Sequence, residues 1–318
     1  MIYSRLLVDL ASQTLTAHDA HGRVLKSYPV STAANGPGER RGSFCTPRGR
    51  HRIRAAIGAG LPADAVFVGR RPTGEHYSEA LAAEAPGRDW ILARILWLCG
   101  TQPRYNRFGE VDSMRRYIYL HGCPDSVPLG RPGSHGCIRM RNADLIELFD
   151  RLQAGCEVVV LENAAAPLSA DEMVIRALPW RLATDAAAVR EQVFIREMGV
   201  PAEVERDAAD ATALHLVAWD RFGRAVGCAR LLPDGWVGRM AVVSDWRGRG
   251  VGARLLTTAL ELASGQGWPL LRLNAQADVC GFYARYGFVP DGEPFMAAGI
   301  LHQRMRRSLV DNSAIGEA

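Results

Sequence analysis

The sequence lacks several features that define whole classes of protein. Its 318 residues hold no apolar run long enough to span a membrane. The first ten residues show no basic stretch, no long apolar core and no small-residue cleavage site, so we expect a cytoplasmic protein. The seven cysteines are scattered and form no C-x-x-C pair, so we expect neither a metal site nor a disulfide framework.

Strong charge patterning is missing as well. The net charge is only +4, the basic residues are nearly all arginine, and no block of like charge stands out. This pattern argues against a nucleic-acid partner. Hydrophobic residues make up 48% of the chain, and its length suits two ordinary domains with packed cores.

The stretch from His121 to Asn142 concentrates the groups that suggest catalysis. A strand-like run, residues 116–120, ends at His121 and Gly122, and a loop rich in Pro and Gly leads to the string Ser134-His135-Gly136-Cys137-Ile138-Arg139. A thiol is a good nucleophile only as a thiolate, so it needs a nearby base or cation. The glycine lets a substrate approach the main chain, and the N–H groups around the cysteine can stabilise an oxyanion.

This string resembles the signature of the YkuD (ErfK-type) L,D-transpeptidases, an HG pair followed by SHGC, a hydrophobic residue and Arg. The strings VDL…QTL, YPVSTA, NGPGE and TPRG extend the resemblance over about the first half of the chain. The resemblance implies a mainly-β domain over residues 1–163, a β-sandwich with a helix at the active-site cleft. We expect that helix at residues 140–154, capped by Asn142, and residues 90–98 read as either a helix or a buried strand.

The resemblance also implies the roles of single residues in this domain. Cys137 is the nucleophile, and His121 is the general base, oriented by the carbonyl of Gly122. The N–H groups near Gly136 and Cys137 form the oxyanion hole. His135, Ser134 and Arg139 shape the pocket, and Arg139 either binds a substrate carboxylate or forms a structural salt bridge.

The implied substrate is a peptidoglycan stem tetrapeptide, which Cys137 attacks at the carbonyl of the L-centre of the diamino acid, expelling D-Ala. An amine acceptor makes the enzyme a transpeptidase and water makes it an L,D-carboxypeptidase. The motif does not separate the two, and the expected cytoplasmic location favours trimming of tetrapeptides during wall recycling. Cys123 stands where the family usually has Thr, and we interpret this as a simple small-residue exchange rather than a redox switch.

A second pattern of strands and helices begins after a linker at residues 164–172 and covers residues 173–318. A helix is expected over 184–198, a strand over 236–243 and a helix over 253–264. Between the last two lies Arg247-x-x-Gly250-x-Gly252. Glycines at a helix N-terminus leave N–H groups free to bind an anion such as a pyrophosphate.

This half resembles a GNAT N-acetyltransferase of the ElaA/YjcF branch, an α/β fold with a central mixed sheet. The resemblance implies that acetyl-CoA binds to Met240, Val242, Arg247, Gly248, Arg249, Gly250, Val251 and Gly252. It makes Tyr283 the candidate acid that protonates the leaving thiolate. Glu197 or His302 could be the base that deprotonates the amine, although a solvated or structural role is the preferred interpretation for each.

Two functional hypotheses follow. The first is a bifunctional enzyme whose GNAT domain acetylates an amine, for example a product of the first domain at raised effective concentration. The second is that one half has become a binding module, such as a GNAT domain that binds acetyl-CoA without turnover beside a true transpeptidase. The expected partners are stem peptides and a small-molecule amine, with no nucleic acid and no membrane span.

Overall fold

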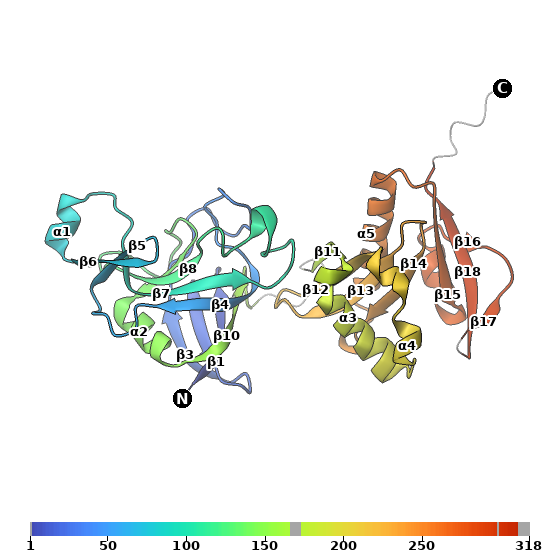
Figure 1. Cartoon of the computed structure of the whole chain (residues 1–318), viewed down its shortest axis with the longest axis horizontal. Helices are drawn as coiled ribbons and strands as arrows, with labels where there is room; N and C mark the ends of the chain where they lie inside the picture. Colours follow the sequence, from blue (N-terminus) through green and yellow to red (C-terminus); the bar gives the residue numbers. More distant parts are fainter. Residues whose placement is uncertain (1, 166–172, 298, 311–318) are drawn as a thin grey trace, which may run out of the picture. The chain divides into compact units, whose positions relative to one another are not determined.

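The computed structural model describes residues 2–165, 173–297 and 299–310, and the chain divides into two compact units near Pro167 (Figure 1). Each unit is described by itself. From residue 166 on, the linker predicted at 164–172 lies outside the described residues. Within the described ranges, no helix is long and apolar enough to cross a membrane.

The first unit is built on one mixed sheet of ten strands in the order β3-β2-β1-β10-β4-β7-β5-β6, with β8 paired to β7 and β9 paired to β8. The strands are β1 (Tyr3–Asp9), β2 (Thr14–His18), β3 (Val24–Pro29), β4 (Gly49–Ile57), β5 (Ala65–Val68), β6 (Arg71–His76), β7 (Ile91–Gly100), β8 (Tyr119–Cys123), β9 (Ile138–Arg141) and β10 (Leu152–Leu161). The helical elements are α1 (Glu79–Glu84), the 3-10 turn η1 (Gly109–Val111) and α2 (Asn142–Asp150).

The core of this unit explains why these segments form strands. Side chains from the beginning, middle and end of this unit, among them Leu15, Leu96, Leu120 and Val158, are fully buried in one cluster. In β2 the buried and partly buried residues alternate, as expected for a strand with one face on a core. The sheet therefore curls around its own apolar face, which confirms the predicted mainly-β domain.

Two predicted elements of this unit have different bounds in the structure. Residues 91–98 belong to strand β7, and the helix expected at 140–154 is the shorter α2. Met140 and Arg141 pair with Gly122 and Cys123 in parallel register, so they extend β9 instead of starting the helix. The N-cap is Arg141, which makes no side-chain capping hydrogen bond. The prediction that Asn142 caps the helix is therefore wrong, and Asn142 is the first residue of α2.

The second unit has two four-stranded sheets. One has the order β11 (Val174–Pro179), β12 (Leu214–Trp219), β13 (Ala225–Leu231), β14 (Val237–Val242). In the other, β18 (Ile300–Ser308) pairs with β15 (Leu270–Gln276), β16 (Val289–Pro290) and β17 (Phe295–Ala297). The helices are α3 (Thr184–Arg190), α4 (Ala202–Glu205), α5 (Val251–Gly265) and α6 (Cys280–Ala284). The 3-10 turns are η3 (Trp180–Leu182), η5 (Ala208–Ala211), η6 (Ser244–Trp246) and η7 (Ala277–Val279), and η4 (Glu191–Glu197) is a π-helical segment.

The helix predicted over 184–198 changes its hydrogen bonding half-way. It runs as the α-helix α3 to Arg190 and continues as the π-helical segment η4. Helix α5 packs with Leu255, Leu256 and Ala259 fully buried against the sheet. These elements confirm the predicted α/β fold of the second unit.

Among the described residues, the two sheets of this unit are joined at one end of β14 and β15. Trp236 forms an isolated bridge with Arg272, and the Arg272 N–H donates to the carbonyl of Gly235 at 2.9 Å. From there β14 continues in one sheet and β15 in the other. Strands that part in this way leave main-chain groups and side chains facing a groove.

A buried ion network ties α3 to the strands of the second unit. The guanidinium of Arg190, 1% exposed, donates to Asp210 Oδ1 at 2.7 Å and also binds the carboxylate of Glu205. Arg230 joins the network through Asp210 at 2.9 Å and Asp207 at 2.6 Å. These charges are paired with one another, which is the condition under which buried charges are tolerated.

Candidate active sites

Strands β8 and β9 bring the predicted nucleophile and base to one place. The two strands pair in parallel with His121 opposite Arg139, and Cys137 immediately precedes β9. His121 is 1% exposed, and its Nδ1 donates to the carbonyl of Gly122 at 2.9 Å. Burial lowers the pKa of His121, so the imidazole is neutral and keeps the lone pair on Nε2.

The thiol of Cys137 is also neutral in this state. Its Sγ donates to the carbonyl of Tyr117 at 3.5 Å, and burial raises its pKa from the ordinary 9.0 to about 11, against a smaller lowering by the main chain of Tyr119. The site therefore holds a protonated thiol and a neutral imidazole at neighbouring strands. Proton transfer then has to accompany attack on a substrate.

This neutral pair predicts slow alkylation of Cys137 at moderate pH. At pH 8 a thiol of pKa about 11 is about 100-fold less ionised than one of pKa 9.0, so iodoacetamide should modify Cys137 about 100-fold more slowly than an unperturbed thiol. The rate should still be rising at pH 10. Peptide mass spectrometry that follows each cysteine separately measures it, with the urea-unfolded chain as reference. A fast rate that is flat below pH 7 would instead indicate a preformed thiolate.

The turn before Cys137 is held by Ser134 and by a neighbouring loop. The Ser134 hydroxyl donates to the carbonyl of Cys137 and accepts from the Gly136 N–H at 3.2 Å, and Ser134 is 1% exposed. Gly136 has φ +126°, and an added Cβ would approach the carbonyl of Cys45 to 3.3 Å. Ser134 thus builds the turn, and its hydroxyl is already engaged within the protein.

Arg139 forms an ion pair inside the site. Its guanidinium donates to Asp89 Oδ1 at 2.6 Å and to the carbonyl of Gly133 at 2.9 Å. The exposed His135 places Nδ1 3.7 Å from the other oxygen of Asp89. Of the two roles considered for Arg139, the geometry therefore favours the salt bridge.

The glycine loop of the second unit has the shape expected for an anion site. Gly248 and Gly250 have φ of +73° and +81°, and Gly250 is the N-cap of α5 with no side-chain cap. Arg247 lies beside it, held by Glu197 through contacts of 2.6 and 2.8 Å and by the carbonyl of Val242 at 3.0 Å. Glu197 is therefore engaged with Arg247.

A groove of about 1020 Å³ runs along β14 to this loop. Seven of the eight residues predicted to bind the cofactor line it: Met240, Val242, Arg247, Gly248, Gly250, Val251 and Gly252. Arg249 is absent from the lining, and its guanidinium lies 5.6 Å from the ring centroid of Trp246. Tyr283 also lines the groove, and burial raises its pKa to about 12, so its hydroxyl keeps its proton.

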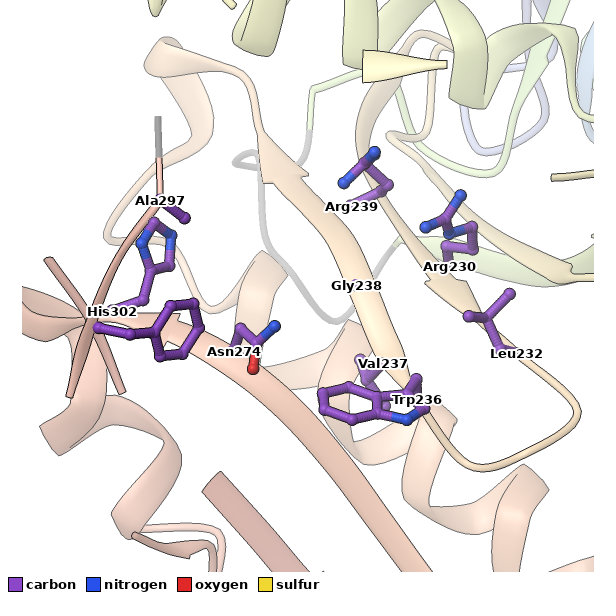
Figure 2. A pocket seen from close by; sticks show the side chains of 10 residues that line it. Arg230, Leu232, Trp236, Val237, Gly238, Arg239, Asn274, Ala297 and His302 are labelled. Atoms are coloured by element: carbon purple, nitrogen blue, oxygen red, sulfur yellow. The ribbon is translucent and has the colours of Figure 1, made fainter. Parts of the chain in front are cut away.

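A smaller cavity of about 330 Å³ adjoins the groove where β14 and β15 part. Figure 2 shows Arg230, Arg239, Asn274 and His302 around the strand that carries Gly238. Arg239, Asn274 and His302 line both spaces. His302 Nδ1 donates to the carbonyl of Ile300 at 2.9 Å, and the ring stacks on Phe295 with centroids 5.8 Å apart.

Comparison with known families matches each unit separately. Residues 3–160 match the family model of the L,D-transpeptidase catalytic domain (YkuD), and residues 182–309 match that of the acetyltransferase (GNAT) domain. The chain joins a YkuD domain to a GNAT domain. Both resemblances found in the sequence are thereby confirmed.

Relatives of the GNAT domain belong to the ElaA/YjcF branch. The uncharacterized N-acetyltransferase YjcF of Bacillus subtilis is 35% identical over 127 residues, which are 39% of this chain and 90% of the relative. Protein ElaA of Escherichia coli is 30% identical over 131 residues, 38% of this chain and 84% of its own. The crystal structure of Escherichia coli ElaA superposes with a TM-score of 0.39 at 27% identity and covers 42% of this chain and 99% of that one.

The groove of the GNAT domain fits the cofactor that this family uses, acetyl-CoA or another acyl-CoA. The positive-φ glycines and the uncapped start of α5 leave N–H donors for a pyrophosphate, as the motif Arg247-x-x-Gly250-x-Gly252 predicts. An added Cβ on Gly252 would lie 3.7 Å from the ring of Phe282, which is an ordinary van der Waals distance. The groove wall at Gly252 would therefore tolerate a methyl group. The cofactor would supply the acyl group as a thioester.

Sequence reasoning missed the residues that complete the YkuD site from a distance. Arg70 and Asp89 lie within residues 58–113, a region that shows no clear periodicity, and Tyr117 lies in the run 116–120, where the pattern indicates a strand but no role at the site. Asp89 pairs with Arg139, the guanidinium of Arg70 stacks on Tyr117, and the Tyr117 carbonyl accepts from the Cys137 thiol. One sequence signal did point to this region. The apolar run at residues 91–98 predicts a buried element, and in the structure it is strand β7, which pairs with β8 beside the site.

The YkuD domain has no space for a side chain at Gly122. An added Cβ would lie 2.1 Å from Asn142 Oδ1 and 2.7 Å from the main-chain carbonyl of Leu92. Gly122→Ala should therefore cost about 1–3 kcal/mol of stability. It should also displace His121, whose Nδ1 donates to the carbonyl of Gly122 itself. Thermal unfolding and the rate of peptide cleavage measure the two effects. Gly265→Ala is the control, because nothing lies within 4 Å of its added Cβ, and an equal loss in both variants would contradict this explanation.

Proposed function

We propose that the YkuD domain, residues 1–163, is an L,D-carboxypeptidase that removes the terminal D-Ala from peptidoglycan stem tetrapeptides. The observation that carries this proposal is the arrangement of Cys137 beside β8, where the Gly122 carbonyl fixes the tautomer of His121. A thiol, an oriented neutral imidazole and a main-chain orienting group are the parts that cysteine-dependent acyl transfer needs.

The proposed reaction uses one proton carrier. His121 Nε2 takes the proton of Cys137 as Sγ bonds to the carbonyl carbon of the L-centre. The imidazolium then gives this proton to the nitrogen of D-Ala as the C–N bond breaks, which leaves a thioester. His121 next takes a proton from water, whose oxygen attacks the thioester, and the released thiolate recovers the proton.

The proposed oxyanion hole uses main-chain N–H groups at Gly136 and Cys137. The Gly136 N–H donates to Ser134 Oγ at 3.2 Å in this state, so it has to exchange that partner for the substrate oxygen. The φ of +126° at Gly136 belongs to the region that favours glycine, which ties the direction of this N–H to the residue type.

We place the reaction in the cytoplasm, as trimming of tetrapeptides to tripeptides during wall recycling. The support is chemical. A GNAT domain draws on acyl-CoA, a metabolite of the cell interior, and the two domains share one chain. There the stem peptides are small recycled or precursor molecules, and water is the abundant acceptor for the thioester.

For the GNAT domain, residues 173–318, we propose acetyl transfer to a small-molecule amine. Tyr283 retains the proton that a leaving thiolate needs, because burial raises its pKa to about 12. His302 borders both the groove and the smaller cavity, and its Nδ1 hydrogen bond leaves Nε2 to accept a proton from the amine. Glu197 holds Arg247 and is not assigned as the base.

One incubation tests both assignments. The purified chain is mixed with a stem tetrapeptide and acetyl-CoA, with and without an added D-amino acid, and the products are followed by mass spectrometry. Tripeptide formation that the D-amino acid barely affects supports the carboxypeptidase. Exchange of D-Ala for the added amino acid would identify a transpeptidase, and an unchanged tetrapeptide would refute cleavage. Acetylated peptide or D-Ala would name the acceptor, whereas acetyl-CoA binding without any acetylated product would make the GNAT domain a binding module.

A further inference from the structure

The side chain of Arg70 lies against two aromatic rings beside the YkuD site. It follows β5, and its guanidinium carbon lies 4.4 Å from the ring centroid of Trp97 and 4.8 Å from that of Tyr117. One of its five N–H groups donates to the hydroxyl of Tyr119 at 3.3 Å. Stacking of this kind orients the planar guanidinium and leaves its edge open for a ligand.

Trp97, Tyr117 and Tyr119 form an aromatic clamp around Arg70. Two of its residues, Tyr117 and Tyr119, also contact Cys137. The carbonyl of Tyr117 accepts the hydrogen bond of the Cys137 thiol, and Tyr119 packs in one apolar cluster with Cys137 and Trp97. Arg70 and Tyr117 both have positive φ, +70° and +58°. Such backbone angles are uncommon in residues other than glycine and often accompany functional sites.

Arg70 differs from the other arginines of the site in its charge balance. Arg139 is neutralised by Asp89 at 2.6 Å, and Arg116 points its guanidinium at main-chain carbonyls, among them Gly38 at 2.9 Å. No carboxylate of the described residues forms an ion pair with Arg70, and the groups that influence its pKa are the tyrosines of the clamp. The domain therefore holds an oriented cation without an anion, one layer of side chains from Cys137.

We propose that Arg70, clamped by Trp97, Tyr117 and Tyr119, binds the terminal carboxylate of the residue that the YkuD domain releases. One residue of an extended peptide spans about 3.5 Å. A carboxylate one residue beyond the scissile carbonyl is therefore displaced from Cys137 by a length on the scale of the single layer of side chains that separates Arg70 from the thiol. A guanidinium binds a carboxylate through two parallel hydrogen bonds, which fixes the peptide end.

This assignment rests on the proposed L,D cleavage and makes its substrate class narrower. The ligand is a peptide with a free carboxylate one residue after the bond that is cut. Peptides that continue further, or end in an amide, lack the anion in that position. Arg70 thereby gives the site exopeptidase specificity, a role that the salt-bridged Arg139 does not supply.

The test compares two substrates on the full-length chain: the stem tetrapeptide and the same peptide with its terminal carboxylate converted to an amide. The unmodified chain should cleave the acid with kcat/KM about 10- to 100-fold above that of the amide, the range expected for a hydrogen bond between charged groups. Arg70→Gln should lose activity on the acid by a similar factor and leave the amide rate unchanged. Arg70→Lys should recover part of the preference.

Arg71→Gln is the matched control, since Arg71 is the next residue, is exposed and begins β6. A change in the acid-to-amide ratio in Arg70→Gln alone supports carboxylate binding, because a purely structural loss lowers both rates together. Equal cleavage of acid and amide by the unmodified chain, or an unchanged ratio in Arg70→Gln, would overturn the assignment and leave the proposed cleavage standing. If the unmodified chain cleaves neither peptide, the proposed function fails first.

Discussion

Cys137→Ala should leave stem tetrapeptides uncut. The variant lacks the sulfur that forms the thioester, and no neighbouring group in the site replaces it, so the rate should fall by about four orders of magnitude or more. The expected result is intact tetrapeptide by mass spectrometry after a time in which the unmodified chain has converted all of it to tripeptide.

The matched control for this variant is Cys280→Ala, which removes a partly buried thiol from α6 of the GNAT domain. It should cleave tetrapeptide at the full rate. Acetyl transfer by Cys137→Ala should stay unchanged if the two domains work independently. Tripeptide formation by Cys137→Ala at even a tenth of the normal rate would contradict the assignment of the nucleophile.

Arg190→Met should unfold the GNAT domain far more easily than any exposed exchange. The substitution removes the cation that pairs with both Glu205 and Asp210, each at most 3% exposed. Asp210 then keeps Arg230 at 2.9 Å and Glu205 the more distant Arg239 at 3.7 Å, so the buried network loses its central cation. Breaking one side of a buried pair costs about 3–5 kcal/mol. The loss should appear as faster hydrogen exchange in β12 and β13 at a fixed urea concentration, with exchange in the YkuD domain unaltered.

Arg306→Met provides the comparison, because its guanidinium lies 3.5 Å from Asp291 at the surface and is 54% exposed. An exposed pair contributes about 0–1 kcal/mol. A similar loss in the two variants would show that burial of the Arg190 network does not determine its contribution.

The residues that sequence analysis identified at the YkuD site form one local string with one chemistry. His121 and Cys137 are 16 positions apart, and the parallel pairing of β8 with β9 places their segments side by side. The sequence could predict that His121 and Cys137 lie close together, because a single loop of the motif joins the two segments that carry them. The same holds for Gly250 at the start of α5, where helix periodicity and glycine position agree.

The residues that were missed reach the site through distant pairings. Arg70 is positioned by the β5–β6 turn, and Asp89 by the chain that enters β7, about 50 residues before its partner Arg139. No local pattern specifies which carboxylate meets which guanidinium. The predicted start of the helix at residue 140 was wrong for a related reason. Met140 pairs with β8, and this pairing outweighs the helical preference of the segment. The π-helical η4, which presents Glu197 to Arg247, has no periodicity that separates it from an α-helix.

Intact-protein mass spectrometry after acid quenching tests the central claim most directly. The unmodified chain is mixed with excess stem tetrapeptide and quenched within the first turnovers. The account predicts an adduct equal in mass to the tetrapeptide minus D-Ala, which hydroxylamine removes and peptide mapping locates on Cys137. Release of D-Ala without such an adduct, or an adduct on another cysteine, would contradict the thioester mechanism and the assignment of Cys137.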